Sequence, residues 1–223
     1  RVTADGAQDV VLEKTVSVSG SLPECYGRGN NNVVHYWADA PGRNDGSSWV
    51  HAYRDLSSAL GALSAEKSEL WIAGSNVLHA STATLASTFN STIRGGFTEC
   101  CDSLEDREDG AISVIDGNDK YALFTVSVTG GLTCFIERMK FCRSVSRNIK
   151  KFGKGNLSLY GCVISDCAKS VIGSGVCISG EQDETVDKSE IVAGENLFDS
   201  CCFENLAHTT ASKYNCAGAA VWV

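Results

Sequence analysis

The sequence predicts an all-β fold, a right-handed parallel β-helix (solenoid) with an amphipathic capping helix near its N-terminal end. Three observations predict it. A segment that ends in cysteine recurs at a nearly regular interval, the chain after Ser68 consists of short apolar runs separated by Gly, Asn, Asp and Ser, and a single stretch has helical periodicity. A chain of 223 residues is long enough to bury a substantial core.

The first part of the chain, residues 1–33, is predicted to be an N-terminal extension. It contains one strand-like run, residues 10–19, whose second half alternates apolar and small polar residues before Gly20 ends it. The chain opens at Arg1 without a Met, so we expect a mature form or an excised piece.

Residues 34–67 are predicted to form a cap. Apolar residues recur with i, i+3, i+4, i+7 spacing between Trp49 and Leu63, and Ser47 or Ser48 can cap the start of this pattern. We therefore expect a helix over about 49–63 with one apolar face. The residues expected to close the end of the β-helix are Trp49, Tyr53, Leu56 and Leu60.

Residues 68–223 are predicted to form the coils of the β-helix. Three segments, 132–142, 157–167 and 191–201, each place a large apolar residue seven positions after an aliphatic one and a cysteine three positions later. The interval between the second and third segments is longer than that between the first and second, and the polar insertion 180–189 accommodates the difference. Stacked coils would align these residues in one interior ladder: Met139, Ile164, Phe198, Cys142, Cys167 and Cys201.

The chain closes on an apolar run, residues 219–223, that looks like the first strand of another coil. Because an open β-helix end exposes unpaired backbone, we expect the coils to continue or to stack on another chain beyond Val223.

Eleven cysteines are many for a chain of this size, and their odd number leaves at least one thiol unpaired within the chain. Neighbours in a stacked column would have Cα atoms about 5 Å apart, a separation that a disulfide can span. Two interpretations stay open, namely buried small hydrophobes and one or more disulfides. Zinc is not expected, because no Cys-x2-Cys pair occurs. The candidate disulfide cysteines outside the ladder are Cys25, Cys100, Cys101, Cys134, Cys162, Cys177, Cys202 and Cys216.

The segment 36–60 carries an Asn-Asp-Gly-Ser-Ser-Trp stretch at 44–49 and resembles the opening of many secreted β-helix proteins. The segments that follow match in order at 69–74, 93–97 and 112–119.

The later coils resemble the polymorphic outer-membrane-protein repeats of autotransporter and adhesin passengers. The Gly-Gly-Ala-aliphatic motif of those repeats has counterparts at 175–178 and 218–221, and their Phe-x-x-Asn motif at 198–201, where Cys201 replaces the asparagine. The resemblance covers residues 34–223. It implies a secreted or cell-surface β-helix.

Composition and charge exclude two classes. The net charge of −8 and the pI near 5.0 are unsuited to general nucleic-acid binding, which needs an excess of Lys and Arg. No stretch approaches 18 apolar residues, so we expect no membrane-spanning segment.

Two charged clusters are candidate binding sites, although a solvated surface is the favoured interpretation of each. The acidic one could supply oxygen ligands to Ca²⁺ through Asp102, Asp106, Asp116 and Asp119, and no other cofactor is expected. The basic one could hold an anionic glycan or an acidic partner. Its residues are Arg138, Lys140, Arg143, Arg147, Lys150, Lys151 and Lys154.

The sequence therefore predicts a secreted or cell-surface structural or adhesive module. We expect it to bind a protein or glycan, or further copies of itself, and the sequons of Asn90 and Asn156 are candidate glycosylation sites. The first alternative is a carbohydrate-active β-helix enzyme, a polysaccharide lyase or hydrolase; it is disfavoured because acidic residues concentrate in loops and the four His share no spacing. The second is a subunit of an extracellular filament.

Overall fold

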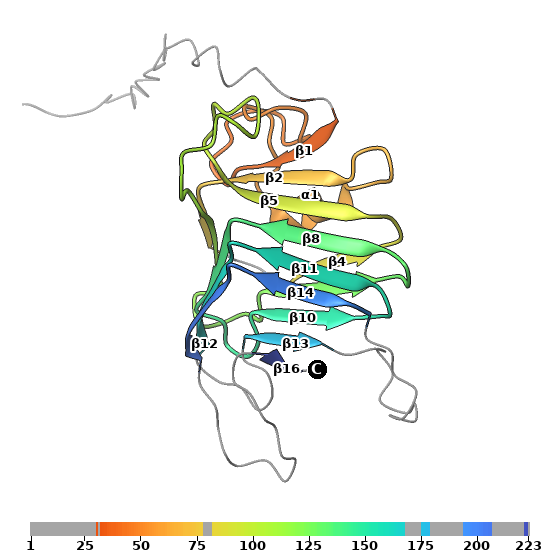
Figure 1. Ribbon diagram of the computed structural model, residues 1–223. Coiled ribbons are helices and arrows are strands. Elements are labelled where there is room, and N and C mark those ends of the chain that lie inside the picture. The colour runs from red at the N-terminus through yellow and green to blue at the C-terminus, as the bar shows by residue number, and fades with distance from the viewer. Residues whose placement is uncertain are drawn as a thin grey trace, which may run out of the picture.

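The computed structural model describes residues 30, 32–77, 82–167, 175–178, 194–206 and 221–222. These residues form three parallel β-sheets and one short helix, so the predicted all-β class is confirmed. Figure 1 shows the strands stacked along one axis. The expected strand at 10–19, Cys25, Cys216 and the insertion 180–189 lie outside the described residues.

The first sheet has six strands and carries the candidate site. In spatial order it contains β1 (Val33–Tyr36), β2 (Glu69–Ala73), β5 (Ser91–Phe97), β8 (Thr133–Glu137), β11 (Asn156–Tyr160) and β14 (Asn196–Asp199).

The second sheet contains β3 (Ser75–Val77), β6 (Ser113–Asp116), β9 (Met139–Cys142), β12 (Val163–Cys167) and β15 (Cys202–Leu206). The third contains β4 (Ala83–Ser87), β7 (Phe124–Val128), β10 (Ile149–Phe152), β13 (Val176–Ile178) and β16 (Val221–Trp222).

From β2 onward the chain visits the three sheets in turn. Each strand from β6 to β13 therefore pairs in parallel with the strands three elements before and after it. We refer to three successive strands, one in each sheet, as a circuit. Paired residues define the circuit length, which is the same from Leu70 to Ile93 as from Ile136 to Leu159. The circuit from Ile93 to Ile136 is much longer, because the loop 98–112 is inserted there.

The main core lies between the three sheets. Alternate strand residues point into it, because successive side chains of a strand face opposite sides. In β2, Leu70 and Ile72 join this core, whereas Trp71 and Ala73 face the other side of the first sheet. There they join a second cluster of buried residues with Val33, Trp49, Phe97 and Cys101.

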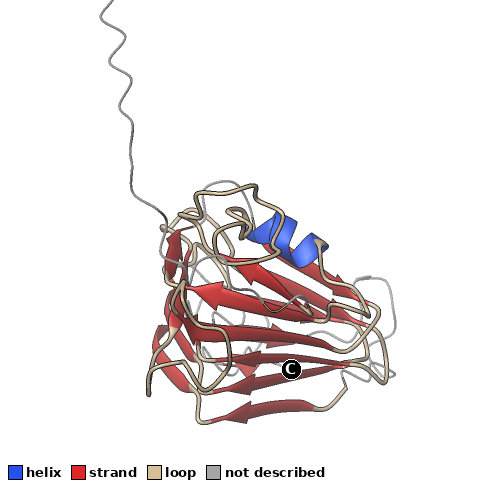
Figure 2. Cartoon of the chain, turned by 90° about the horizontal axis from the view of Figure 1, so that it is seen from above, coloured by secondary structure: helices blue, strands red, loops and turns tan. Residues whose placement is uncertain are grey.

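The predicted helix is shorter than expected. It spans α1 (Leu56–Gly61), because the Asp55 carboxylate accepts a hydrogen bond from the Ser58 amide at 2.7 Å and caps the helix there. Leu56 and Leu60 are buried in the main core, and α1 packs against β1 and β4. Figure 2 shows α1 in blue beside the stacked strands. Trp49 lies before the helix in the second cluster, and Tyr53 bridges to Tyr36.

The predicted interior ladder is wrong in its register. Lys140 pairs with Val163 and Val163 with Cys202, so Met139, Cys162 and Cys201 stand one above another directly before these positions. Ile164 stacks between Phe141 and Phe203 in the next column.

The three ladder cysteines therefore lie in three different columns and do not stack on one another. Cys142 lies beside Asp116, and Cys167 lies between Ser144 and Leu206. Phe198 belongs to the first sheet, where it pairs with Leu159. The second-sheet circuit runs from Phe141 to Ile164, which is two positions shorter than the interval between Cys142 and Cys167. A shift by two positions leaves every side chain on the same face, so the pattern of apolar residues did not reveal it.

Candidate binding face on the first sheet

The outward side chains of four neighbouring strands in the first sheet form two adjacent columns. Strand pairing aligns Arg94, Glu137, Tyr160 and Asp199 in one column. It aligns Thr92, Phe135, Ser158 and Leu197 in the other. We name these eight residues the binding face. They come from β5, β8, β11 and β14, which lie one below another in Figure 1.

The binding face exposes apolar surface. Among the described residues, three large hydrophobic side chains are exposed, and two of them lie here: Tyr160 at 46 % and Leu197 at 60 %. Tyr160 and Leu197 occupy neighbouring strands and neighbouring columns. An exposed apolar patch that is rimmed by polar residues is typical of an interaction site.

One end of the face is fixed by a cluster of ion pairs. The Arg94 guanidinium contacts Glu69 at 2.6 Å and Glu137 at 2.9 Å, and the Arg107 guanidinium contacts Glu137 at 2.6 Å. Burial alone would raise the pKa of Glu137, but the hydrogen bonds from both arginines outweigh it and lower the pKa, so this carboxyl stays ionised. The Arg94 guanidinium also lies 5.8 Å from the centre of the Phe135 ring.

Arg107 belongs to the loop 98–112 and attaches that loop to the sheet. Its Nη1 donates to the Gly95 carbonyl at 3.2 Å, and its guanidinium lies 5.0 Å from the Phe97 ring centre. Cys101, in the same loop, is buried in the second cluster, where its carbonyl accepts a hydrogen bond from Trp49 Nε1 at 2.6 Å. The segment from Cys101 to Arg107 is therefore held against the end of the binding face that Arg94 and Glu137 form.

The acidic residues of the predicted Ca²⁺ site are used in other ways. The Asp106 carboxylate accepts hydrogen bonds from the amides of Asp102 and Ser103 at 2.9 Å each, which closes a turn within the loop. Asp116 lies on β6 and binds Arg143, whose Nε is 2.9 Å away. In the part of the chain that the structure describes, no three His, Cys, Asp or Glu side chains are grouped to hold a metal ion. The four predicted ligands, Asp119 included, are therefore not brought together.

The predicted basic band does not form one surface. Lys140 faces outward on β9 in the second sheet, and Lys150 lies on β10 in the third, where its Nζ is 4.2 Å from the Phe152 ring centre. Arg138 donates to the Glu108 carbonyl at the corner between the first two sheets. Because a circuit winds through three sheets, residues 138–154 are distributed around the molecule. Arg147 precedes β10 and Lys154 follows it.

Lys151 differs from the rest of the band because it is fully buried and points inward between Val126 and Ile178. Its Nζ donates to the Gly153 carbonyl at 2.7 Å. Burial lowers the pKa of Lys151 to about 8. Lys151 is therefore an interior residue and cannot contribute to a surface for an acidic partner.

Both sequon asparagines lie where strands of the first sheet begin. Asn90 Oδ1 accepts a hydrogen bond from the Thr133 amide at 2.9 Å, and Asn156 Oδ1 accepts one from the Glu195 amide at 2.8 Å. Asn156 Nδ2, the atom that glycosylation would modify, donates to Thr133 Oγ1 at 3.4 Å. Their glycosylation stays a prediction.

The cysteines occupy several environments. The free thiols among the described residues are Cys101, Cys134, Cys142, Cys162, Cys167, Cys177, Cys201 and Cys202. Cys100 is disulfide-bonded, and its partner is none of these eight. Six of the eight are buried, which agrees with the small-hydrophobe interpretation for most of them.

Sequence reasoning missed every residue of the binding face. A signal was present, because Phe135 and Tyr160 are aromatic residues at outward positions of strands whose alternate residues are apolar and inward. These residues can be recognised as one surface only when the strand register is known, because the pairing of β8, β11 and β14 is what brings their side chains together.

No helix in the described residues is long and apolar enough to cross a membrane. Comparison of the chain with protein-family models, with curated proteins and with solved structures found no match.

Proposed function

We propose that the chain is a right-handed parallel β-helix that serves as a secreted or cell-surface adhesive module and binds a glycan through the binding face. Three parallel sheets that the chain visits in turn support the β-helix assignment. The right hand follows from the strong preference of parallel strand crossovers for that hand. The resemblance of residues 34–223 to secreted β-helix proteins and adhesin passengers supports the location.

The observation that carries the proposal is the exposed Tyr160 ring between two carboxylates. Strand pairing places Glu137 on one side of Tyr160 and Asp199 on the other, each one strand away. An amphipathic aromatic ring offers an apolar surface against which the C–H face of a sugar can pack. Neighbouring carboxylate and hydroxyl groups, here Asp199 and Ser158, can bind the hydroxyls of that sugar.

The surroundings of Tyr160 favour binding without large rearrangement. Leu159 and Ile136, the inward neighbours in β11 and β8, are fully buried in the main core. Glu137 is held by two arginines, and the loop segment 101–107 is attached to the sheet through one of them. A site whose groups are already held in place loses less entropy when a ligand binds.

The proposal is tested by binding to a panel of immobilised glycans, read out for the wild-type chain and two variants. We expect Tyr160→Ala to reduce affinity for the selected glycan by about tenfold or more, because it removes the central aromatic contact. Ile112→Ser is the matched control, since Ile112 is an exposed apolar residue outside the binding face. It should leave affinity unchanged.

Three results would contradict the proposal. The first is that no glycan binds, or that Tyr160→Ala binds as well as Ile112→Ser. The second is the appearance of new reducing ends or unsaturated products on the panel, which would indicate the enzymatic alternative. The third is end-to-end polymers of the unliganded chain whose formation Tyr160→Ala leaves intact, which would indicate a filament subunit that pairs through edge strands.

A further inference from the structure

Two free thiols meet between adjacent circuits, outside the binding face. Cys162 directly precedes β12 and Cys201 directly precedes β15, and these strands pair in parallel. The Cys202 amide donates to the Cys162 carbonyl at 2.8 Å, which holds the two backbones together beside the two cysteines. Register neighbours on parallel strands have Cα atoms about 4.8 Å apart, within the range that a disulfide spans.

Both side chains lie on the core side of the second sheet, Cys162 within the main core and Cys201 packed against it, one circuit apart. Cys162 Sγ lies 3.5 Å from the Tyr160 carbonyl, and Cys201 Sγ lies 3.3 Å from the Asp199 carbonyl. Cys162 is fully buried, whereas Cys201 is partly exposed. One thiol is therefore accessible to a reagent, and the other can be reached through the first.

The interaction between the two neighbouring thiols shifts their pKa values in opposite directions. It lowers the pKa of Cys201, while the same interaction together with burial raises the pKa of Cys162. The neighbouring Cys202 is a natural comparison. It is exposed, but a hydrogen bond to Glu204 raises its pKa. Because the thiolate is the nucleophile in disulfide exchange, Cys201 should react before Cys202 despite its lower exposure.

We propose that Cys162 and Cys201 form a redox-active dithiol that closes to a disulfide by exchange with a low-molecular-weight disulfide such as oxidised glutathione. The Cys201 thiolate attacks one sulfur of oxidised glutathione, so the S–S bond of glutathione breaks and one glutathione thiolate leaves. Cys162 then gives up its proton and attacks Cys201 Sγ, which displaces the second glutathione. Two protein thiols are oxidised, and one glutathione disulfide is reduced to two thiols.

The disulfide would join the circuit that contains β11 and β12 to the circuit that contains β14 and β15. It would tie the corner between β14 and β15 to the corner between β11 and β12, where the Gly161 amide already donates to the Asp199 carbonyl at 3.0 Å. Closing the long loop from position 162 to position 201 restricts the unfolded chain, so the oxidised form should be more stable. This inference does not depend on glycan binding.

The test incubates the reduced full chain with oxidised glutathione, quenches with acid, alkylates the remaining thiols and maps non-reduced peptides by mass spectrometry. We expect a peptide pair linked through Cys162 and Cys201, and a melting temperature higher by roughly 5–15 °C than that of the reduced chain. The Cys162→Ser variant should instead retain glutathione on Cys201, because the resolving thiol is gone. Cys202→Ser is the matched control and should form the same link as the wild-type chain.

The proposal is overturned if Cys162 and Cys201 are both alkylated after oxidation, or if the wild-type chain accumulates glutathione on Cys201 without closing. A link from Cys162 to Cys202 would also overturn it. Should Cys162→Ser fail to fold, the wild-type map and the Cys202→Ser map still decide between these outcomes.

Discussion

His35 shows how a single polar residue is held at the centre of an apolar cluster. It is fully buried, its ring packs edge-on against Trp49 with centroids 4.7 Å apart, and its Nδ1–H donates to the Gly46 carbonyl at 3.1 Å. Burial lowers the pKa of His35 to about 4, so the ring is neutral in the folded protein at physiological pH. It therefore acts as a packing residue and not as an acid–base group.

The depressed pKa of His35 predicts a loss of stability in acid. Between about pH 6.5 and pH 4 the unfolded chain binds a proton at this residue while the folded chain does not, so the free energy of unfolding decreases as the pH falls through that window. The difference between the two pKa values corresponds to about 3 kcal/mol. His35→Asn keeps an N–H donor near Gly46 but cannot titrate, and should remove this part of the pH dependence.

Urea unfolding of the wild-type chain and the variant at several pH values between 7 and 4 checks this prediction. An unchanged slope in His35→Asn would show that His35 does not control acid stability.

At the scale of the element, the turns between sheets set the angle at which one strand follows another. The turn from the first sheet to the second contains one residue with positive φ in four circuits: Gly74 (72°), Arg138 (49°), Gly161 (57°) and Ser200 (54°). A single left-handed residue bends the chain sharply enough to start the next strand. Two of the four are not glycine, so a side chain is tolerated at this corner at a small cost.

Glycine is required for a different reason at Gly153, which follows β10. Its φ is 80°, and a Cβ there would lie 2.4 Å from the Val128 carbonyl oxygen, whereas a Cβ at Gly161 would meet nothing within 4 Å. We expect Gly161→Ala to cost about 1 kcal/mol of unfolding free energy, from the backbone alone. Gly153→Ala should cost about 2–4 kcal/mol, because the backbone of β7 must move as well.

Urea unfolding of the two variants under the same conditions measures the difference. Equal losses would mean that β7 and β10 are not packed as closely at this corner as the structure has them.

The elements also show what the sequence could and could not provide. It correctly predicted an all-β fold, because the short apolar runs after Ser68 are typical of strands. It overestimated the helix, since the apolar period continues upstream of Asp55 although the Asp55 side chain caps the helix. The pattern could not provide the strand register, because Cys142 and Cys167 look equivalent in the repeated segments but belong to different stacked columns. Without register, Tyr160 and Leu197 could not be recognised as neighbours.

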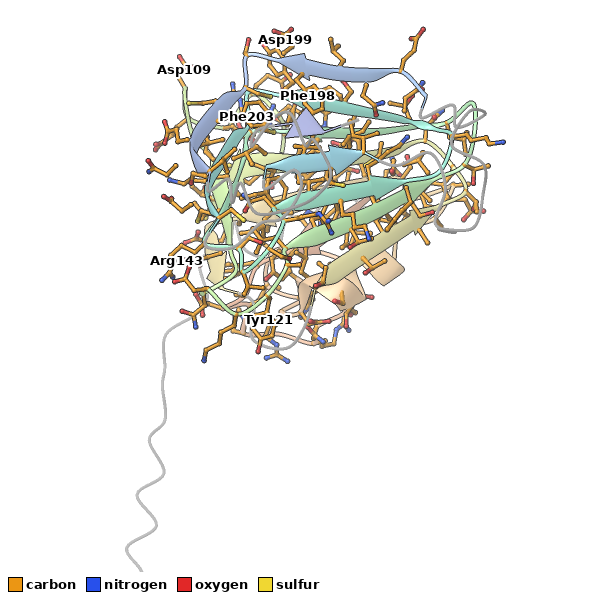
Figure 3. The ribbon with its side chains drawn as sticks, turned by 90° about the horizontal axis from the view of Figure 1, so that it is seen from below. Asp109, Tyr121, Arg143, Phe198, Asp199 and Phe203 are labelled. Atoms are coloured by element: carbon orange, nitrogen blue, oxygen red, sulfur yellow. The ribbon has the colours of Figure 1, made fainter. Side chains whose placement is uncertain are left out.

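At the scale of the whole molecule, the apolar side chains of each circuit are buried only when both neighbouring circuits cover them. The inward residues of the last circuit that the structure describes show this dependence. Phe198 and Phe203 pack edge-on with centroids 6.2 Å apart, yet both stay only partly buried. Figure 3 shows these two rings between β14 and β15, with Asp199 on the outside. Within the described residues, β14, β15 and β16 are the outermost strands of their sheets.

The stacking of circuits is the claim on which the binding face and the dithiol both depend, and a cross-link tests it most directly. In a Cys201→Ser background, the pair Ser158→Cys and Leu197→Cys replaces residues that face each other on β11 and β14. Their Cα atoms should lie about 4.8 Å apart, so mild oxidation should link them, as peptide mapping would show. The pair Ser158→Cys and Asp199→Cys, shifted by two positions, should stay unlinked. Preferential linking of the shifted pair would contradict the register and, with it, the assembly of the binding face.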